Sequence, residues 1–209
     1  AGLRYQGMKT AQAREQIVKD LEVIGLIEKI EDYDHNIARC DRCNSIIEPI
    51  QSKQWFLKME RLAKLAIKAI KNKETIIYPK KWEKVLLDRL KNERDWNISR
   101  QLWWGHKIPI KGETDVLDTW FSSALWPFAT LGWPLDEARG KPLDEAKGKQ
   151  SDLKTYYPTD FITSGRDIRD IWIAKMIFSG IEFMGKSPFK IAHIHATVLN
   201  KEGKRMSKS

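Results

Sequence analysis

The residues with the clearest capacity for chemistry lie in a basic loop at positions 200–209. Four cations, two hydroxyls and one glycine fall within these ten residues, which end in Arg-Met-Ser-Lys-Ser. Cations on a loop can close over a triphosphate and stabilise the charge that develops as pyrophosphate leaves, while hydroxyls bind its oxygens. The same composition also suits an exposed basic tail, so the position of the loop in the fold must decide its role.

The elements before this loop predict an α/β fold with a parallel sheet. Residues 160–163 and 189–199 are apolar runs typical of buried strands, and residues 167–184 between them favour a long helix. A strand, a helix and a strand with short connections form a parallel crossover. Ligands of such folds bind at the carboxyl ends of the strands, which here are the turn at Gly165 and the loop after residue 199.

The first half of the chain predicts further helices and one short strand. Thr10 can cap a helix, and glycines stop two of the predicted helices. We expect helices at 10–24, 60–72 and 82–92, and a strand at 75–78. Residues 93–133 are aromatic-rich without a clear period, which predicts loops and short strands around a site. A tandem octapeptide at 134–149 predicts a low-complexity loop without a catalytic role.

Composition narrows the class of protein. The 209 residues include 37 basic and 28 acidic side chains, a net charge of +9, which suits a polyanionic partner such as tRNA or a nucleotide, or a Lys-rich solvated surface. No apolar run approaches the ~20 residues of a membrane span, and no signal peptide opens the chain. We therefore expect a cytoplasmic protein without membrane association.

The two cysteines suggest a metal knuckle. Cys40 and Cys43 form a Cys-x2-Cys pair, and His35 lies five residues before it. Structural zinc requires four ligands in a tetrahedron, so one pair with a possible third ligand is an incomplete zinc site. Two free thiols are the alternative.

The terminal loop resembles the Lys-Met-Ser-Lys-Ser signature of class I aminoacyl-tRNA synthetases, with Arg205 at the first lysine. This resemblance implies that Lys208, assisted by Arg205 and Ser207, stabilises the pyrophosphate leaving group, and that Met206 and Lys208 belong to an ATP site that works with Mg²⁺. Arg205 keeps the charge of lysine but has a planar fork in place of an ammonium.

Two further segments resemble the nucleotide site of the same family. The sequence Thr-Ser-Gly-Arg-Asp ending at Asp167 is similar to the family's Gly-x-Asp turn. The resemblance implies that Gly165 lets the backbone approach adenosine and that Asp167 accepts from a ribose hydroxyl. His195, followed by Ala196, is similar to the family's His-Gly pair beside the nucleotide.

Two Trp-rich segments, at 94–106 and 115–127, resemble the valine-specific enzymes of the family. The resemblance implies an amino-acid pocket lined by Trp104 and Trp120, with Asp115 and Val116 beside it. Rigid indole walls suit a small branched side chain. We expect Trp82, Trp126 and Trp133 to be packing residues. Two alternatives stay open: an isoleucine-type enzyme, and a non-catalytic basic tRNA-binding module.

The resemblance covers nearly the whole chain and implies its organisation. Residues 1–75 would be a connective α+β segment that follows the editing insertion, and residues 76–209 the second half of a split Rossmann-type catalytic domain. The expected reaction is that of an aminoacyl-tRNA ligase: ATP-dependent activation of valine, then transfer to tRNA(Val), by a monomeric full-length enzyme. The chain lacks the family's His-x-Gly-His signature and is short between residues 108 and 115.

The missing signature generates a first prediction. We expect the purified 209-residue chain to catalyse valine-dependent pyrophosphate exchange weakly or not at all, because half of the ATP site is absent from its sequence. An isotope exchange assay with ATP, valine and labelled pyrophosphate measures this. Exchange near the rate of a complete enzyme of this family would contradict the prediction.

Overall fold

The computed structural model describes residues 3–40, 43–133 and 152–206, and these fall into two compact units that divide between Gln51 and Ser52. The first unit contains a short 3-10 helix, Leu3–Tyr5, and helix α1, Thr10–Val23. This confirms the predicted first helix, although Lys9 rather than Thr10 occupies the N-cap position. The 3-10 helix is tied to α1 through Tyr5, whose hydroxyl donates to Asp20 over 2.8 Å.

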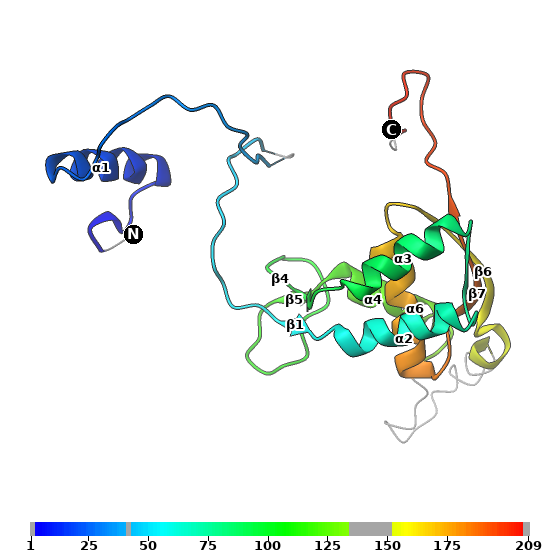
Figure 1. Ribbon diagram of the computed structural model, residues 1–209. Helices are drawn as coiled ribbons and strands as arrows, with labels where there is room; N and C mark the ends of the chain where they lie inside the picture. The colour runs from blue at the N-terminus through cyan, green and yellow to red at the C-terminus, as the bar shows by residue number, and fades with distance from the viewer. Residues whose placement is uncertain (1–2, 41–42, 134–151, 207–209) are drawn as a thin grey trace. The chain divides into compact units, whose positions relative to one another are not determined.

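The second unit contains a three-stranded parallel sheet, whose strands β6 and β7 lie at one side of the unit (Figure 1). Its strand order is β2 (Ile76–Tyr78), β7 (Phe189–His195) and β6 (Thr159–Gly165), and both pairings are parallel. The predicted α/β class and parallel crossover are confirmed. Residues 164–165, predicted as a turn, still belong to β6, and β7 ends four residues before position 199. Both strands stop together because Gly165 and His195 are the last paired residues.

Helices α2 (Glu60–Lys71), α3 (Lys81–Lys91) and α6 (Ala174–Met184) share one apolar core with the sheet. The buried side of α2 packs against α6 through small and branched side chains, among them Ala66 and Ile70, which are fully buried. The compact unit therefore begins at residue 52, upstream of the boundary at residue 75 in the sequence-based division, because α2 and the residues just before it pack with the sheet.

The predicted helix at 167–184 has two parts. A π-helical segment, Arg169–Ile173, leads into α6, and Gly185 ends the helix in the left-handed conformation with φ of 72°. The glycine stop is confirmed, because only glycine adopts this backbone conformation without strain. π-helical turns are rare and often mark functional sites. This one begins four residues after the last residue of β6.

Helix α4, Thr119–Ala129, corrects the expectation of loops and short strands alone in this region. Its sequence is apolar on most sides and contains Pro127, so it shows no amphipathic period to recognise. Asp118 occupies its N-cap position, a signal that could have located its start. The short strands were expected: β1 (Phe56–Leu57) pairs with β3 (Trp96–Asn97), and β4 (Ser99–Arg100) pairs with β5 (Val116–Leu117).

Lys175 of α6 is a buried ammonium group. Its side chain is 7% exposed, and Nζ lies 2.9 Å from the centroid of the Trp96 ring. Burial lowers the pKa of Lys175 to about 8, against the opposing effect of the Asp118 carboxylate. The folded protein therefore carries this charge at neutral pH in spite of its burial.

Among the helices of the described residues, none is long and apolar enough to cross a membrane.

The pKa of Lys175 generates a prediction about stability. Above pH 8 the folded protein releases this proton while the unfolded chain keeps it until about pH 10.4. The unfolded state then binds more protons, so the free energy of unfolding rises with pH. Relative to Lys175→Met, the wild type should gain about 2 kcal/mol between pH 7 and pH 10. Denaturant unfolding followed by tryptophan fluorescence measures this; a difference that does not vary with pH would refute it.

Candidate functional site

A pocket of about 370 Å³ lies at the carboxyl edge of the parallel sheet. It is formed by the ends of β2 and β7, the start of α3 and the turn after β6. Its lining residues are Pro79, Lys81, Trp82, Arg166, His193, Ile194, His195, Ala196, Thr197 and Leu199. This is the edge at which the parallel topology predicted a ligand. Arg166, the middle residue of the predicted Gly-x-Asp turn, was not predicted to line a site, and Trp82 was expected to be a packing residue, yet both line this pocket.

Gly165, Asp167 and His195 meet at this edge. A side chain at position 165 is disfavoured by space: a Cβ there would lie 2.7 Å from Oδ1 of Asp167 and 3.7 Å from Cε1 of His195. Nδ1 of His195 lies 2.8 Å from the carbonyl oxygen of Ala196 and donates to it, which makes Nε2 the acceptor of the neutral ring. The three residues expected at an adenosine site are thus brought together by the parallel register.

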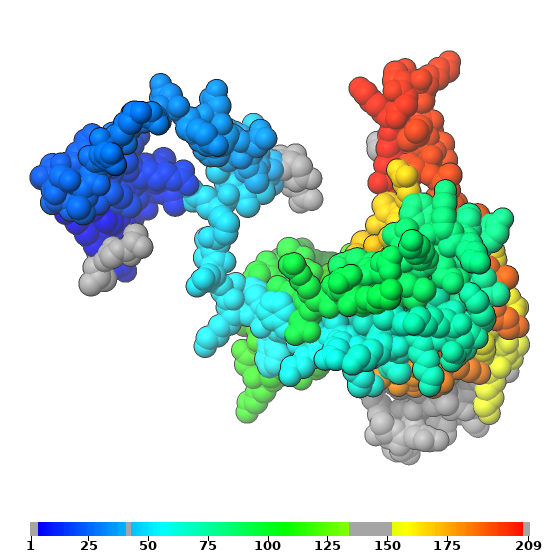
Figure 2. Space-filling model, in the orientation of Figure 1, coloured from blue at the N-terminus to red at the C-terminus, as the bar shows by residue number. Residues whose placement is uncertain are grey.

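The basic loop forms a hairpin that returns to the same edge. Leu199 forms an antiparallel bridge with Arg205, and the Asn200 side chain accepts from the Lys204 N–H over 2.8 Å. Nη2 of Arg205 then donates to Oδ2 of Asp167 over 2.7 Å. Figure 2 shows this hairpin, in red, standing out from the body of the second unit. Arg205 is therefore placed at the sheet edge with Asp167.

Met206 is the last residue of the predicted signature that the structure describes. The backbone N–H of Met206 donates to the carbonyl of Val198 over 3.2 Å, and the Met206 side chain is exposed. The predicted phosphate-binding residues Ser207 and Lys208 lie outside the described residues.

A second pocket, of about 300 Å³, lies beside α4 and is lined by indole rings. Its lining residues are Trp120, Ser123, Trp126, Ile168 and Trp172. Trp120 was predicted to line an amino-acid pocket. Trp126 was expected to be packing, which is wrong: its side chain is 54% exposed and faces this pocket. Trp126 follows Trp120 by six residues, and that spacing could have been recognised only with α4 known.

The other residues predicted for the amino-acid pocket lie elsewhere. Trp104 is 80% exposed and does not line the indole pocket, and Val116 is buried in β5. Gly105 connects the two positions: a Cβ on it would lie 2.8 Å from Cγ2 of Val116. Asp115 accepts from the Gln101 side chain over 2.7 Å and lines a separate polar pocket.

One turn of the chain contributes to both the strand-end pocket and the indole pocket. Arg166 lines the pocket at the strand ends, and Ile168, two residues later, lines the indole pocket. Asp167 lies between them in sequence and carries the ion pair to Arg205. A ligand with a nucleotide at one end and a small apolar side chain at the other would therefore span a single turn of the chain.

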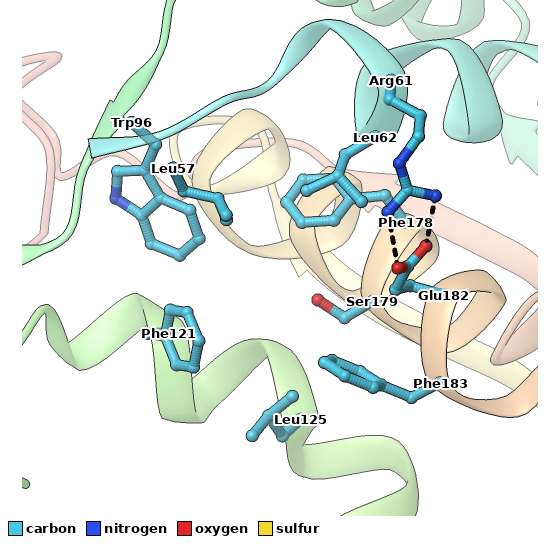
Figure 3. Close-up of a pocket in the computed structure, with 10 residues that line it drawn as sticks. All are labelled: Leu57, Arg61, Leu62, Trp96, Phe121, Leu125, Phe178, Ser179, Glu182 and Phe183. Carbon is cyan, nitrogen blue, oxygen red and sulfur yellow. Dashed lines mark hydrogen bonds and ion pairs between the residues drawn. The ribbon is translucent and has the colours of Figure 1, made fainter. Parts of the chain in front are cut away.

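A third pocket, of about 150 Å³, lies on the opposite side of α4 (Figure 3). Phe121 and Leu125 of α4 line it together with apolar side chains of α2 and α6. At its rim the Arg61 guanidinium donates two hydrogen bonds to the Glu182 carboxylate, over 2.7 and 2.5 Å. Because its charged groups are already paired with each other, we assign this pocket to helix packing. Helix α4 therefore separates the indole pocket from this packing pocket.

The residues that flank the cysteine pair are joined by backbone hydrogen bonds in the first unit. Arg39 bridges Ile46, and the Cys40 N–H donates to the Ser45 carbonyl over 2.9 Å. Both thiols are free, and hydrogen bonds, chiefly from Ser45, lower the pKa of the Cys43 thiol to about 7. In the described ranges, no three His, Cys, Asp or Glu side chains gather as a metal site, and His35 stacks on Tyr33. A complete zinc site is therefore not shown.

The sequence and the fold both place the chain in a known family. The family model for class I tRNA synthetases (I, L, M and V) matches residues 5–113 and 110–209, so the chain belongs to the class I tRNA synthetases. The two matched stretches meet at the short connection between residues 108 and 115.

The similar curated proteins are valine–tRNA ligases. Those of Thermotoga maritima, Petrotoga mobilis and Geobacter sulfurreducens are 45%, 44% and 41% identical to this chain over its full length. The chain spans about a quarter of their length, 26% of the first and 25% of the other two.

A solved structure supports the fold. The methionyl-tRNA synthetase of Mycobacterium tuberculosis, bound by methionyl-adenylate, superposes with a TM-score of 0.59 at 16% identity, over 83% of this chain and 31% of that one. At this identity the likeness shows the class I catalytic fold alone.

The ion pair of Arg205 generates a prediction about titration. The Arg205 guanidinium, followed by backbone hydrogen bonding, holds the pKa of the Asp167 carboxyl below its usual range. We expect Arg205→Ala to return the pKa of Asp167 toward that range. Carboxyl-detected NMR titration of the two proteins measures the shift, with Asp160, whose ion pair is to Lys190, as an internal control. An unchanged Asp167 titration would show that Arg205 does not hold the carboxylate in solution.

Proposed function

We propose that this chain supplies the part of a valine–tRNA ligase that holds adenosine and the valine side chain next to each other. The supporting observation is the shared turn, which contributes Arg166 to the pocket at the strand ends and Ile168 to the indole pocket. Activation of an amino acid joins its carboxylate to the α-phosphate of ATP. The nucleotide and the amino acid must therefore bind side by side, and proximity of the reacting groups lowers the barrier.

In this proposal the strand-end pocket binds adenosine. Gly165 leaves room for the ligand to approach the backbone, Asp167 accepts from a ribose hydroxyl, and the imidazole of His195 lies beside them. Arg205, which pairs with Asp167 in this structure, exchanges that partner for the nucleotide as the hairpin closes. The ribose hydroxyl then donates to an Asp167 carboxylate that is already ionised.

The indole pocket binds the valine side chain. Trp120, Trp126 and Trp172 are rigid apolar walls, and a volume near 300 Å³ accepts a small branched side chain. The proposal places Trp104 and Val116 in the neighbouring part of the site, because Gly105, which follows Trp104 directly, approaches Val116 closely. Asp115 lies in the adjacent polar pocket.

Lys208 and Ser207, with Arg205, act at the phosphates. The valine carboxylate oxygen attacks the α-phosphorus of Mg²⁺-bound ATP, the bond to the β-phosphate oxygen breaks, and pyrophosphate leaves with the bonding electron pair. Cations at the leaving group stabilise the charge that develops. In the second step the valyl group is transferred to tRNA(Val), whose phosphates suit a chain of net charge +9. We propose a cytoplasmic enzyme that acts as a monomer.

A hybrid enzyme tests the proposal. The segment of Thermotoga maritima valine–tRNA ligase that matches this chain is replaced by the chain, and valine-dependent pyrophosphate exchange is measured. We expect exchange within about tenfold of the parent enzyme, and a loss on the order of 10²-fold in kcat for Lys208→Ala, the size found for removal of one preorganised charge-stabilising group.

The amino acid that supports exchange and the matched variants distinguish the valine enzyme from an isoleucine-type enzyme and from a non-catalytic tRNA-binding module. Lys201→Ala, in the same hairpin but outside the signature, serves as the control and should retain exchange. Preference of the hybrid for isoleucine would contradict the valine assignment. Equal loss in Lys201→Ala and Lys208→Ala would contradict a specific role of the signature, and tRNA binding without any exchange would favour the binding-module alternative.

A further inference from the structure

We infer that Asp118 is a positioning residue of the amino-acid pocket, which fixes the indole of Trp120 and thereby the size of the side chain that the pocket accepts. The inference rests on the proposed function of the indole pocket. Its basis is a buried polar cluster of Asp118, Trp96, Arg100 and Lys175 at the amino end of α4, here called the Asp118 cluster.

Each oxygen of the Asp118 carboxylate has a defined partner. Oδ2 accepts from the Trp96 indole N–H over 2.8 Å and from Nη2 of Arg100 over 3.0 Å. Oδ1 accepts from the backbone N–H of Trp120 over 3.4 Å. The backbone N–H of Asp118 donates to the Ile98 carbonyl over 2.7 Å, so the residue is held on both sides.

The partners come from four different elements. Trp96 belongs to β3, Arg100 to β4, Trp120 to α4, and the Lys175 ammonium of α6 rests on the Trp96 ring. Asp118 itself is 6% exposed. A buried carboxylate at a helix N-terminus is stabilised by the free N–H groups, by the helix dipole and here by two cations. The cluster therefore fixes where α4 begins with respect to β3, β4 and α6.

The two ends of α4 are anchored independently. Near its carboxyl end, Phe128 is fully buried and packs edge-on against Trp133, at a centroid distance of 5.1 Å, and against Tyr157, at 6.1 Å. The amino end depends on the Asp118 cluster. Trp120 lies two residues from Asp118, so loosening the cluster displaces Trp120 while Phe128 keeps the helix in place.

This geometry separates a positioning role from a contribution to stability. A displaced Trp120 widens the indole pocket, which weakens binding of valine and admits a larger side chain. The strand-end pocket shares no residue with the Asp118 cluster or with α4, so ATP binding does not depend on the cluster. Loss of the cluster should therefore weaken binding of the amino acid and leave binding of the nucleotide unchanged.

Asp118→Asn in the hybrid enzyme tests the inference. The amide keeps the shape of the carboxylate, but in either orientation its NH₂ group faces N–H donors: those of Trp96 and Arg100 at the position of Oδ2, or that of the Trp120 backbone at the position of Oδ1. At least one hydrogen bond is therefore lost. We expect KM for valine to rise about tenfold and the preference for valine over isoleucine in kcat/KM to fall about tenfold. KM for ATP should change less than twofold.

Leu125→Ala is the matched control. Leu125 lies on the other side of α4 and packs against the Phe128 cluster at the carboxyl end of the helix. It lines the packing pocket together with Phe121 and Trp96 but takes no part in the hydrogen bonds of the Asp118 cluster, so its truncation lowers the Tm and keeps those hydrogen bonds. KM for valine and the valine preference should stay at the wild-type values. Equal changes in the two variants, or an unchanged valine preference in Asp118→Asn, would overturn the inference.

A second variant keeps the test decisive if Asp118→Asn does not fold. Trp96→Phe removes the indole N–H donor and retains both the ring under Lys175 and the cap to Trp120. We expect a smaller shift in the same direction, about threefold in KM for valine, and the absence of any shift would overturn the inference. Inactivity of the unsubstituted hybrid toward valine would instead count against the proposed function. This outcome is therefore distinguishable from failure of the inference about Asp118.

Discussion

The parallel register of β6 and β7 is the constraint on which the site depends. The two strands end together, with Gly165 opposite His195, and this common end delivers the turn at Asp167 and the hairpin at Arg205 to one edge. Backbone hydrogen bonds fix the register, and a shift by one residue would turn every side chain of a strand to the opposite face. The buried residues Ala192 and Ile194 would then face away from the core.

Two sets of opposite charges stabilise the site, one exposed to solvent and one buried. The ion pair of Arg205 and Asp167 is exposed, so water and salt screen it and the hairpin can exchange partners at low cost. The cluster around Asp118 is buried, and removing one of its members would leave the others unpaired in a medium of low dielectric. The exposed pair thus suits a part that moves, and the buried cluster suits a part that stays fixed.

The sequence predicted the elements whose periodicity is local. The parallel strands, the long helix before Gly185 and the Gly165–Asp167 turn were recognisable because alternation, amphipathic spacing and glycine punctuation are properties of short segments. Helix α4 was missed because it is apolar on both sides, which removes the signal that a one-sided helix provides. The pocket role of Trp126 was missed for the same reason.

Other features depend on contacts between distant segments and could not be found locally. The pairing of Arg205 with Asp167 joins residues 38 positions apart, and Lys175 meets Trp96 across 79 positions. The sequence also placed Trp104 in one pocket with Trp120, whereas the structure leaves Trp104 exposed and brings Trp172 to that pocket. Family motifs identified which residues to consider, and tertiary packing determined which of them meet.

Helix α4 has a consequence for how sequences of this kind can diverge. One side of the helix faces the indole pocket and the other faces an apolar packing space (Figure 3). Substitutions on the packing side are constrained only by the total side-chain volume. Phe121 and Leu125 can therefore change together if the volume gained at one position equals the volume lost at the other. On the indole side shape itself is under selection. The two opposite sides of one short helix should therefore accumulate substitutions under two different rules.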